Sequence, residues 1–234
     1  ASTRGNPLIS YTSTTESAQY SVGHLKKAIR ALARTPGVEG IQLLAHSRGT
    51  ALLLNAFREL AIEAVVAGED PAEAFKLKNV VLMSPDIDTD VAVQQLEIFS
   101  SDPGLTSRWD KPRLPRYLDG RFTIYASPSD RALLLSKILF RSRERVGELP
   151  PDKVSPAAQA HLVRVGNVDI DVYEGRHTDP YGHSYFSSNP EVSADLVERI
   201  RHGTAPGEPG RRLIREGRIT WVFPTDGGAP GGGR

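Results

Sequence analysis

The sequence predicts a single α/β domain, with a mostly parallel sheet that carries helices on both of its faces. Short apolar runs at 41–45, 79–84 and 121–126 have the length of strands that are buried on both sides. A segment with helical periodicity follows each of these runs. Because parallel strands need a crossover long enough to hold a helix, this alternation favours a parallel sheet.

The first part of the chain is expected to form one loop and one helix before the first strand. Residues 1–16 are polar, and we expect a loop there. Apolar residues recur every three or four positions over 17–34, which predicts a helix that a Pro-Gly pair ends. The run at 41–45 is then a buried strand, and a long helix extends to Val66.

The turn between that strand and that helix is Ala45-His46-Ser47-Arg48-Gly49. It is a small-x-Ser-x-Gly pattern, a nucleophile elbow with Ala in place of the first Gly. Since the turn is sharp, we expect only small side chains to fit two residues on either side of Ser47. A serine at the amino end of a helix also lies where developing negative charge is favoured. The alternative is a serine that only caps the helix.

Three more strands are expected downstream of the elbow. A polar connection at 68–76 leads to the strand at 79–84, which Pro85 ends and a short helix follows. The strand at 121–126 leads into another helix, and alternating apolar residues predict a fourth strand within 162–172. A last helix is expected from about 190 to 201.

Two polar segments are interpreted as surface. Residues 100–120 are rich in Pro, Gly and charge, and we expect a long loop whose Trp109 and Tyr117 could cover the site. Residues 141–145 are a charged helix end, which is typical of a solvated face.

The domain prediction places one folded unit at 1–203 and a tail at 204–234. Gly and Pro dominate the tail, so we expect it to be flexible, with one short strand possible at 219–223.

Composition limits the classes of partner. The chain has 234 residues, of which 39% are hydrophobic, enough for a sizeable core. Lys and Arg total 29 against 28 Asp and Glu, and the net charge of +1 indicates no nucleic-acid partner. No apolar run reaches the roughly 18 residues of a membrane span, and no signal peptide is visible. We therefore expect a cytoplasmic protein, although the first residue, Ala1, leaves a removed leader or anchor open. Composition does not predict the oligomeric state.

No metal or other cofactor is expected. The chain has no cysteine, which excludes disulfides, a cysteine nucleophile and thiolate metal ligands. Its six histidines lack the spacing of a zinc site, and Asp86, Asp88 and Asp90 lack the Gly and Glu that complete a calcium loop.

A serine hydroxyl needs a base within hydrogen-bond reach and a carboxylate that orients the base. Hydrolases of the α/β type supply these in the order Ser, Asp or Glu, His. The chain offers Ser47, then Asp130 at the end of the next strand but one, then His183 after the following strand. Carboxyl ends of parallel strands meet at one edge of a sheet, so we expect these three side chains to lie together.

Each member of this set has a competitor. Asp86 and Asp88 also follow a strand and are alternative acids, while Asp130 could be a plain helix cap. His177 and His161 compete with His183 for the role of base. His46 is interpreted as packing or loop support. The backbone N–H of Arg48 is the expected first donor of an oxyanion hole.

Four motifs in one order then resemble a known group. AHSRG, SPDIDTDV, YASPSDRALLLS and GHSYF are similar to segments of the bacterial α/β-hydrolases catalogued as "domain of unknown function 900", over roughly 11–201. The resemblance implies an α/β-hydrolase fold and a serine hydrolase, such as an esterase or lipase. It implies Ser47 as nucleophile, Asp130 as acid and His183 as base.

One part of the family pattern is missing. Family members carry, upstream of the matched region, a strand with a His-Gly motif that supplies the second oxyanion donor. The residues before Ser47 contain no such motif, so we expect an α/β-hydrolase fold without its N-terminal strands. The chain would then be part of a longer protein or a truncated product. Removing one oxyanion donor costs about 100- to 1,000-fold in rate in another hydrolase.

Three functions follow from this pattern. The first is hydrolysis of a small-molecule carboxylic ester through a Ser-His-Asp triad and an acyl-enzyme. The second is an interaction domain that keeps the elbow but is catalytically impaired or inactive. The third is a thioesterase or acyltransferase with the same triad. The sequence does not identify substrate-binding residues.

Overall fold

A computed structural model of the chain describes residues 7–101, 118–140, 145–148, 167–175 and 179–224. Its elements, in chain order, are helix α1 (Pro7–Arg34), strand β1 (Ile41–His46), helices α2 (Gly49–Val66) and α3 (Pro71–Phe75), strand β2 (Leu77–Met83), helix α4 (Thr89–Ser101), strand β3 (Phe122–Ala126), helix α6 (Arg131–Phe140), the 3-10 helix η1 (Val146–Glu148), strand β4 (Val168–Val172), helices α8 (Tyr185–Ser188) and α9 (Pro190–His202), and strands β5 (Ile214–Arg215) and β6 (Thr220–Val222).

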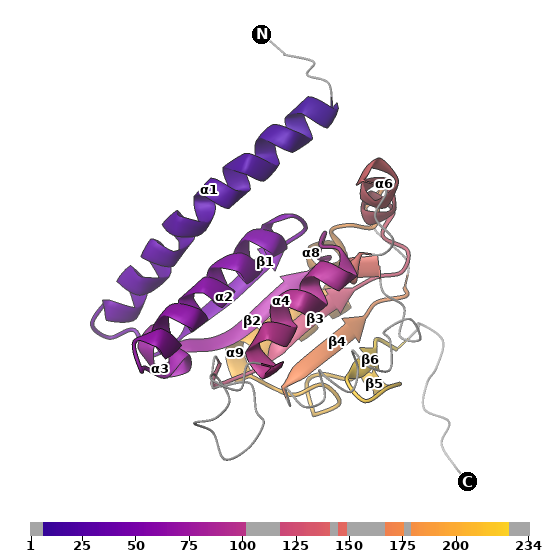
Figure 1. Ribbon diagram of the computed structural model, residues 1–234. Coiled ribbons are helices and arrows are strands. Elements are labelled where there is room, and N and C mark those ends of the chain that lie inside the picture. The colour runs from indigo at the N-terminus through magenta and orange to yellow at the C-terminus, as the bar shows by residue number, and fades with distance from the viewer. Residues whose placement is uncertain (1–6, 102–117, 141–144, 149–166, 176–178, 225–234) are drawn as a thin grey trace.

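Six strands form one sheet in the order β1-β2-β3-β4-β6-β5 (Figure 1). Every neighbouring pair is parallel except β5 and β6, which are antiparallel. The register aligns the ends of the first four strands, since His46 pairs with Met83, Met83 with Tyr125, and Tyr125 with Asp171. The predicted mostly parallel sheet is therefore confirmed, and its carboxyl edge brings together the loops that follow β1 to β4.

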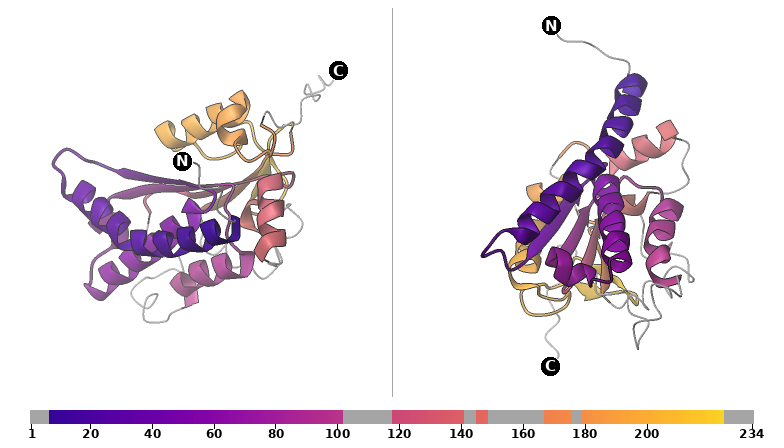
Figure 2. Two further views of the ribbon diagram at one scale, coloured as in Figure 1. Left: turned by 90° about the horizontal axis from the view of Figure 1, so that it is seen from above. Right: turned by 60° about the vertical axis from the view of Figure 1, so that its left-hand side comes forward.

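Helices cover both faces of the sheet, as the sequence predicts. Helices α1, α2 and α4 lie on one side of the sheet, and α9 lies on the other (Figure 2, left). Alternating residues of β2 pack into the hydrophobic cores on the two faces of the sheet. Val80 and Leu82 belong to the hydrophobic core that includes α2, whereas Val81 and Met83 belong to the core that includes α8 and α9. Because both faces are buried over residues 80–83, this part of β2 has no polar side chain, which explains its continuous apolar run.

Helix α1 begins ten residues before the position that the sequence predicts. Residues 7–16 are helical rather than a loop. Pro7 occupies the first helical position, where a missing backbone N–H costs nothing. Further along, Lys26 binds Glu59 and Glu63 of α2 at 2.5 and 2.6 Å, which fixes the C-terminal half of α1 on α2. The N-terminal half extends past α2 (Figures 1 and 2).

The connection expected at 68–76 contains the short helix α3. Asp70 caps it by accepting a hydrogen bond from the N–H of Ala72 at 2.9 Å. Lys76 ends it in the left-handed conformation, with φ 51°. A helix of this length is too short for its periodicity to be visible in the sequence.

The segment predicted to be a flexible tail packs on the sheet as far as residue 224. Its Arg211 is fully buried and donates hydrogen bonds to Asp195 of α9 at 2.9 and 3.0 Å and to Asp171 of β4. Tyr125 donates to the same Asp195 at 2.6 Å. The short strand expected at 219–223 is confirmed as β6, which pairs with β4. The boundary after residue 203 is therefore wrong for 204–224, because a buried ion pair holds that segment, and 225–234 lie outside the described residues.

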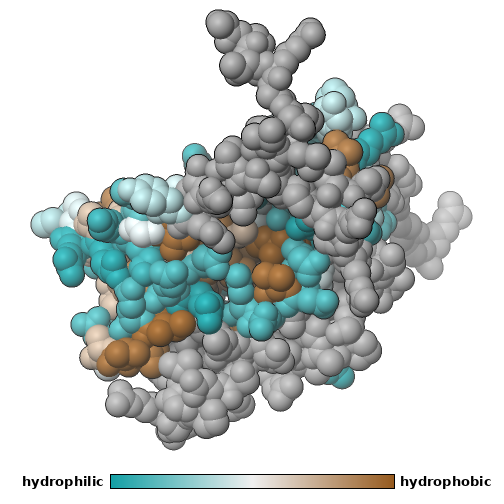
Figure 3. Space-filling model, turned by 45° about the horizontal axis from the view of Figure 1, so that its top comes forward, coloured by the Kyte–Doolittle hydropathy of each residue, from teal (hydrophilic) through white to brown (hydrophobic). Residues whose placement is uncertain are grey.

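The surface gives two further facts. The face in Figure 3 is hydrophilic over most of its coloured area, with separate apolar patches. None of the helices in the described part of the chain combines the length and the apolar character that crossing a bilayer requires.

Candidate active site

Ser47 lies in a strained turn at the carboxyl end of β1. Its φ is 54°, in the left-handed region that non-glycine residues seldom adopt. The Ser47 N–H donates to the carbonyl of Met83 at 3.0 Å, and the Ser47 carbonyl accepts from the N–H of Thr50 at 3.1 Å. The strand before it and the helix after it match the context that a nucleophile elbow requires. The neighbouring strand holds the turn, so the strained conformation is fixed on both sides of the serine.

The steric argument for Gly49 does not hold among the described residues. A Cβ placed on Gly49 would meet no described atom within 4 Å beyond its own neighbours, and its φ is not positive. Strain in this turn is therefore concentrated at Ser47 itself.

Asp130 and His183 form a hydrogen-bonded pair beside this turn. Asp130 follows β3 and is almost fully buried, at 1% exposure. Its Oδ2 lies 2.7 Å from Nδ1 of His183, while its Oδ1 accepts from the N–H groups of Ala132 and Leu133 at 3.0 and 3.2 Å. Asp130 thus caps α6 with one carboxylate oxygen and holds the imidazole with the other.

The loop that carries His183 follows β4 and is tied to two neighbouring segments. The carbonyl of Tyr181 accepts from the N–H of Arg131 at 2.8 Å, next to Asp130. The carbonyl of His183 lies 3.1 Å from Nε2 of His46. Because His46 directly precedes Ser47, this contact joins the elbow to the histidine loop. Ser47, Asp130 and His183 therefore follow β1, β3 and β4 at the carboxyl edge of the sheet, where His183 contacts Asp130 and His46.

A comparison with models of protein families identifies the family of the chain. Residues 3–200 match the family described as "Alpha/beta hydrolase of unknown function (DUF900)". The chain belongs to this family. Membership indicates a hydrolase and agrees with the sheet described above. No curated protein and no solved structure matches the chain significantly.

The two alternative acids of this α/β-hydrolase have other partners. Asp86 is buried, accepts from Oγ of Ser136 at 2.8 and 3.0 Å, and lies 3.3 Å from Nε of Arg145. Asp88 accepts from the N–H of Asp90 at 3.0 Å, at the start of α4. Arg145, expected on a solvated face, is thus buried against Asp86 because the carboxylate compensates its charge.

The remaining predicted residues are placed as follows. Arg48 is the N-cap residue of α2, so its backbone N–H lies at the amino end of that helix. His46 contacts the loop and the ring of His183, as its interpretation as loop support predicts. The other two candidate bases and the two loop aromatic residues, which are His161, His177, Trp109 and Tyr117, lie outside the described residues.

One residue beside His183 was missed by the sequence analysis. The carboxylate of Asp179 accepts hydrogen bonds from the backbone of the His183 loop, including the N–H of His183 at 3.1 Å. The available signal was the turn sequence Asp-Pro-Tyr-Gly directly before His183, since Asp and Gly at a Pro are typical of a tight turn with a side-chain acceptor.

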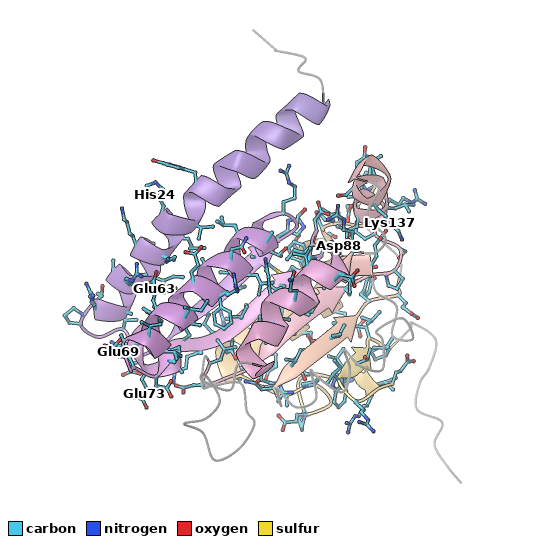
Figure 4. The ribbon with its side chains drawn as sticks, in the orientation of Figure 1. His24, Glu63, Glu69, Glu73, Asp88 and Lys137 are labelled. Atoms are coloured by element: carbon cyan, nitrogen blue, oxygen red, sulfur yellow. The ribbon has the colours of Figure 1, made fainter. Side chains whose placement is uncertain are left out.

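A pocket of about 600 Å³ lies away from this site, between α1, α2 and α3. Glu63, Glu69 and Glu73 contribute to its lining, together with Arg30 and Arg34. Figure 4 labels the three glutamates at one end of the molecule and Asp88, which follows β2, toward the other. Within the described residues, no group of three or more His, Asp or Glu side chains is arranged to hold a metal ion.

Proposed function

We propose that the chain is a serine hydrolase that cleaves a small-molecule carboxylic ester, with Ser47 as nucleophile, His183 as base and Asp130 as the acid of the triad. The observation that carries this proposal is the 2.7 Å contact between Asp130 and Nδ1 of His183, beside the left-handed turn of Ser47. A buried carboxylate on Nδ1 selects the tautomer whose Nε2 is free to accept a proton.

The proposed reaction has two stages. Nε2 of His183 takes the proton of the Ser47 hydroxyl while Oγ attacks the ester carbonyl, and the imidazolium then returns that proton to the leaving alcohol. Water, activated by the same nitrogen, cleaves the acyl-enzyme and releases the carboxylic acid, so that Ser47 regains its proton. Asp130 keeps its charge throughout and stabilises the imidazolium.

The developing oxyanion would lie at the amino end of α2. The backbone N–H of Arg48 is the proposed donor, and the helix dipole of this 18-residue helix favours negative charge at the same point. The first turn of α2 carries no acidic residue that would oppose this charge.

The test is labelling by a fluorophosphonate probe, with Ser84→Ala as the matched control for Ser47→Ala. Ser84 is also a left-handed serine at a strand end, with φ 44°, but it is fully buried. We expect labelling of the wild-type chain and of Ser84→Ala, and none of Ser47→Ala, while circular dichroism reports a fold for all three. A folded wild-type chain that does not react would instead support an inactive interaction domain.

Product analysis then distinguishes an ester hydrolase from an acyltransferase and from a thioesterase. A hydrolase releases the free acid whether or not a second alcohol is present, whereas an acyltransferase forms a new ester with the added alcohol. A thioesterase cleaves a thioester in preference to the matching oxygen ester.

A further inference from the structure

The loop that presents His183 is organised around one carboxylate, that of Asp179. Oδ1 of Asp179 accepts from the N–H groups of Tyr181 and His183, both at 3.1 Å, and Oδ2 accepts from the N–H of Ser184 at 3.1 Å. The N–H of Gly182 donates to the backbone carbonyl of Asp179 at 3.3 Å. Pro180 has no N–H. Every backbone donor from 181 to 184 is therefore directed at Asp179.

This arrangement fixes a conformation that the backbone would not keep alone. Gly182 has φ 66°, and the N–H groups on both sides of it turn toward the same carboxylate. Successive N–H groups that converge in this way form a concave site for an anion, which the side chain of Asp179 fills. Although partial burial opposes the shift, hydrogen bonds from the backbone of Ser184, His183 and Tyr181 lower the pKa of Asp179. The carboxylate is thus charged at neutral pH.

Within residues 179–184, which the structure describes, His183 is the side chain that bonds to Asp130. The tie from Tyr181 to Arg131 is a backbone contact, and the tie from His46 reaches the His183 carbonyl. Those two contacts tie Tyr181 to α6 and His183 to β1. The carboxylate of Asp179 accepts from the backbone N–H groups of both residues and of Ser184.

We propose that Asp179 is a positioning residue for His183: its carboxylate holds residues 181–184 in the single conformation that keeps the imidazole on Asp130. This assignment rests on the proposed function, because the direction of His183 matters for rate only if His183 is the base. It assigns Asp179 no contact with the substrate.

The experiment compares Asp179→Ala and Asp179→Asn with Asp70→Ala. Asp70 is a matched control, since its carboxylate also accepts a backbone N–H at 2.9 Å, but at the start of α3 before β2. The rate of fluorophosphonate labelling and the kcat and KM for a p-nitrophenyl ester are measured at temperatures well below the unfolding midpoint of each variant.

We expect Asp179→Ala to lose about 10- to 100-fold in labelling rate and in kcat with KM unchanged, the range that misplacing a reacting group produces. Asp179→Asn should fall between Asp179→Ala and the wild type, because its amide keeps one acceptor, and Asp70→Ala should match the wild type.

A second readout does not depend on catalysis. In NMR spectra, the proton between Nδ1 of His183 and Asp130 should give a far-downfield signal that disappears in Asp179→Ala and persists in Asp70→Ala. Hydrogen exchange of residues 179–184 should accelerate only in the Asp179 variants. If the wild type reacts with neither probe nor ester, the proposed function fails, and these spectra alone decide the positioning role. Wild-type labelling rates in Asp179→Ala, or a downfield signal retained in it, would overturn the inference.

Discussion

His46 and His183 pack ring against ring, with their centroids 4.5 Å apart and their planes tilted by 47°. The ring of Phe186 also packs against that of His46, at 4.7 Å between centroids. Burial, followed by the charge of His183, lowers the pKa of His46 from its ordinary value of 6.5. His46 is therefore neutral at pH 7 and donates from Nε2 to the carbonyl of His183.

The first prediction concerns pH-dependent stability at His46. Between the lowered pKa of the folded chain and 6.5, the unfolded chain binds a proton that the folded chain does not. The free energy of unfolding is therefore highest above pH 6.5 and falls as the pH decreases toward the folded-state pKa. In His46→Gln the amide can still donate to the carbonyl, but this pH-dependent loss disappears. Urea unfolding of both proteins at pH 7.5 and 5.5 measures the difference, and an equal loss in both would contradict the prediction.

Asp130→Asn should separate the two roles of Asp130. The asparagine oxygen can still cap α6 by accepting from Ala132 and Leu133, so stability should change little. Its amide cannot select the reactive tautomer of His183, and labelling should slow by about 100- to 10,000-fold, as for the corresponding change in a serine protease. Asp130→Ala should slow labelling as much and also cost about 1 kcal/mol through loss of the cap. Labelling of Asp130→Asn at the wild-type rate would remove Asp130 from the triad.

Asp86→Asn should lower the stability of the protein but leave the labelling rate nearly unchanged. The change leaves Arg145 buried beside a neutral partner, and breaking a buried ion pair in this way costs about 3–5 kcal/mol. The labelling rate per folded molecule should stay close to that of the wild type, since the side chain of Asp86 binds Arg145 and Ser136, and its contact with the Ser47 carbonyl comes from the backbone N–H, which the substitution keeps. Thermal unfolding and labelling in one buffer test both parts. A stable variant with slow labelling would make Asp86 the acid.

Arg211→Met should destabilise the whole sheet. It leaves the carboxylates of Asp171 and Asp195 buried without their common partner, a loss of about 3–5 kcal/mol. The matched control is Arg212→Met, because Arg212 is the adjacent residue and is exposed. Denaturant unfolding should separate the two variants clearly. Equal stability would mean that the C-terminal segment is as dispensable as its composition suggests.

Patterns that depend on burial predicted most of the fold. A strand between two helical layers must be apolar on both faces, so β2 and β3 are recognisable as apolar runs. β1 was also expected to be buried on both faces, but it is an edge strand in which Leu44 is 41% exposed. The strand-turn-helix context of Ser47 follows from the same runs. Asp130 and His183 could then be proposed from strand order alone, because parallel strands bring their carboxyl ends to one edge.

Pairings over long sequence distances were not predictable in this way. Arg211 lies 40 positions from Asp171, within a segment whose Gly and Pro content is typical of disorder. A charged residue is usually solvated, and nothing local indicates that this one is buried against two carboxylates. Asp179 was missed for a related reason. Its partners are backbone N–H groups, which every residue but proline has, so the sequence marks the turn at 179–182 but not the donors that the carboxylate binds.

The pairing of β6 with β4 also sets an order of events in biosynthesis. β4 leads directly into the loop of His183, yet its outer neighbour is encoded about fifty residues later, beyond Arg211. A ribosome delivers the chain in order, so Ser47, Asp130 and His183 are all synthesised before Arg211, the common partner of Asp171 and Asp195. β4 therefore gains its outer neighbour, and Asp171 its counter-charge, only after the three site residues have been synthesised.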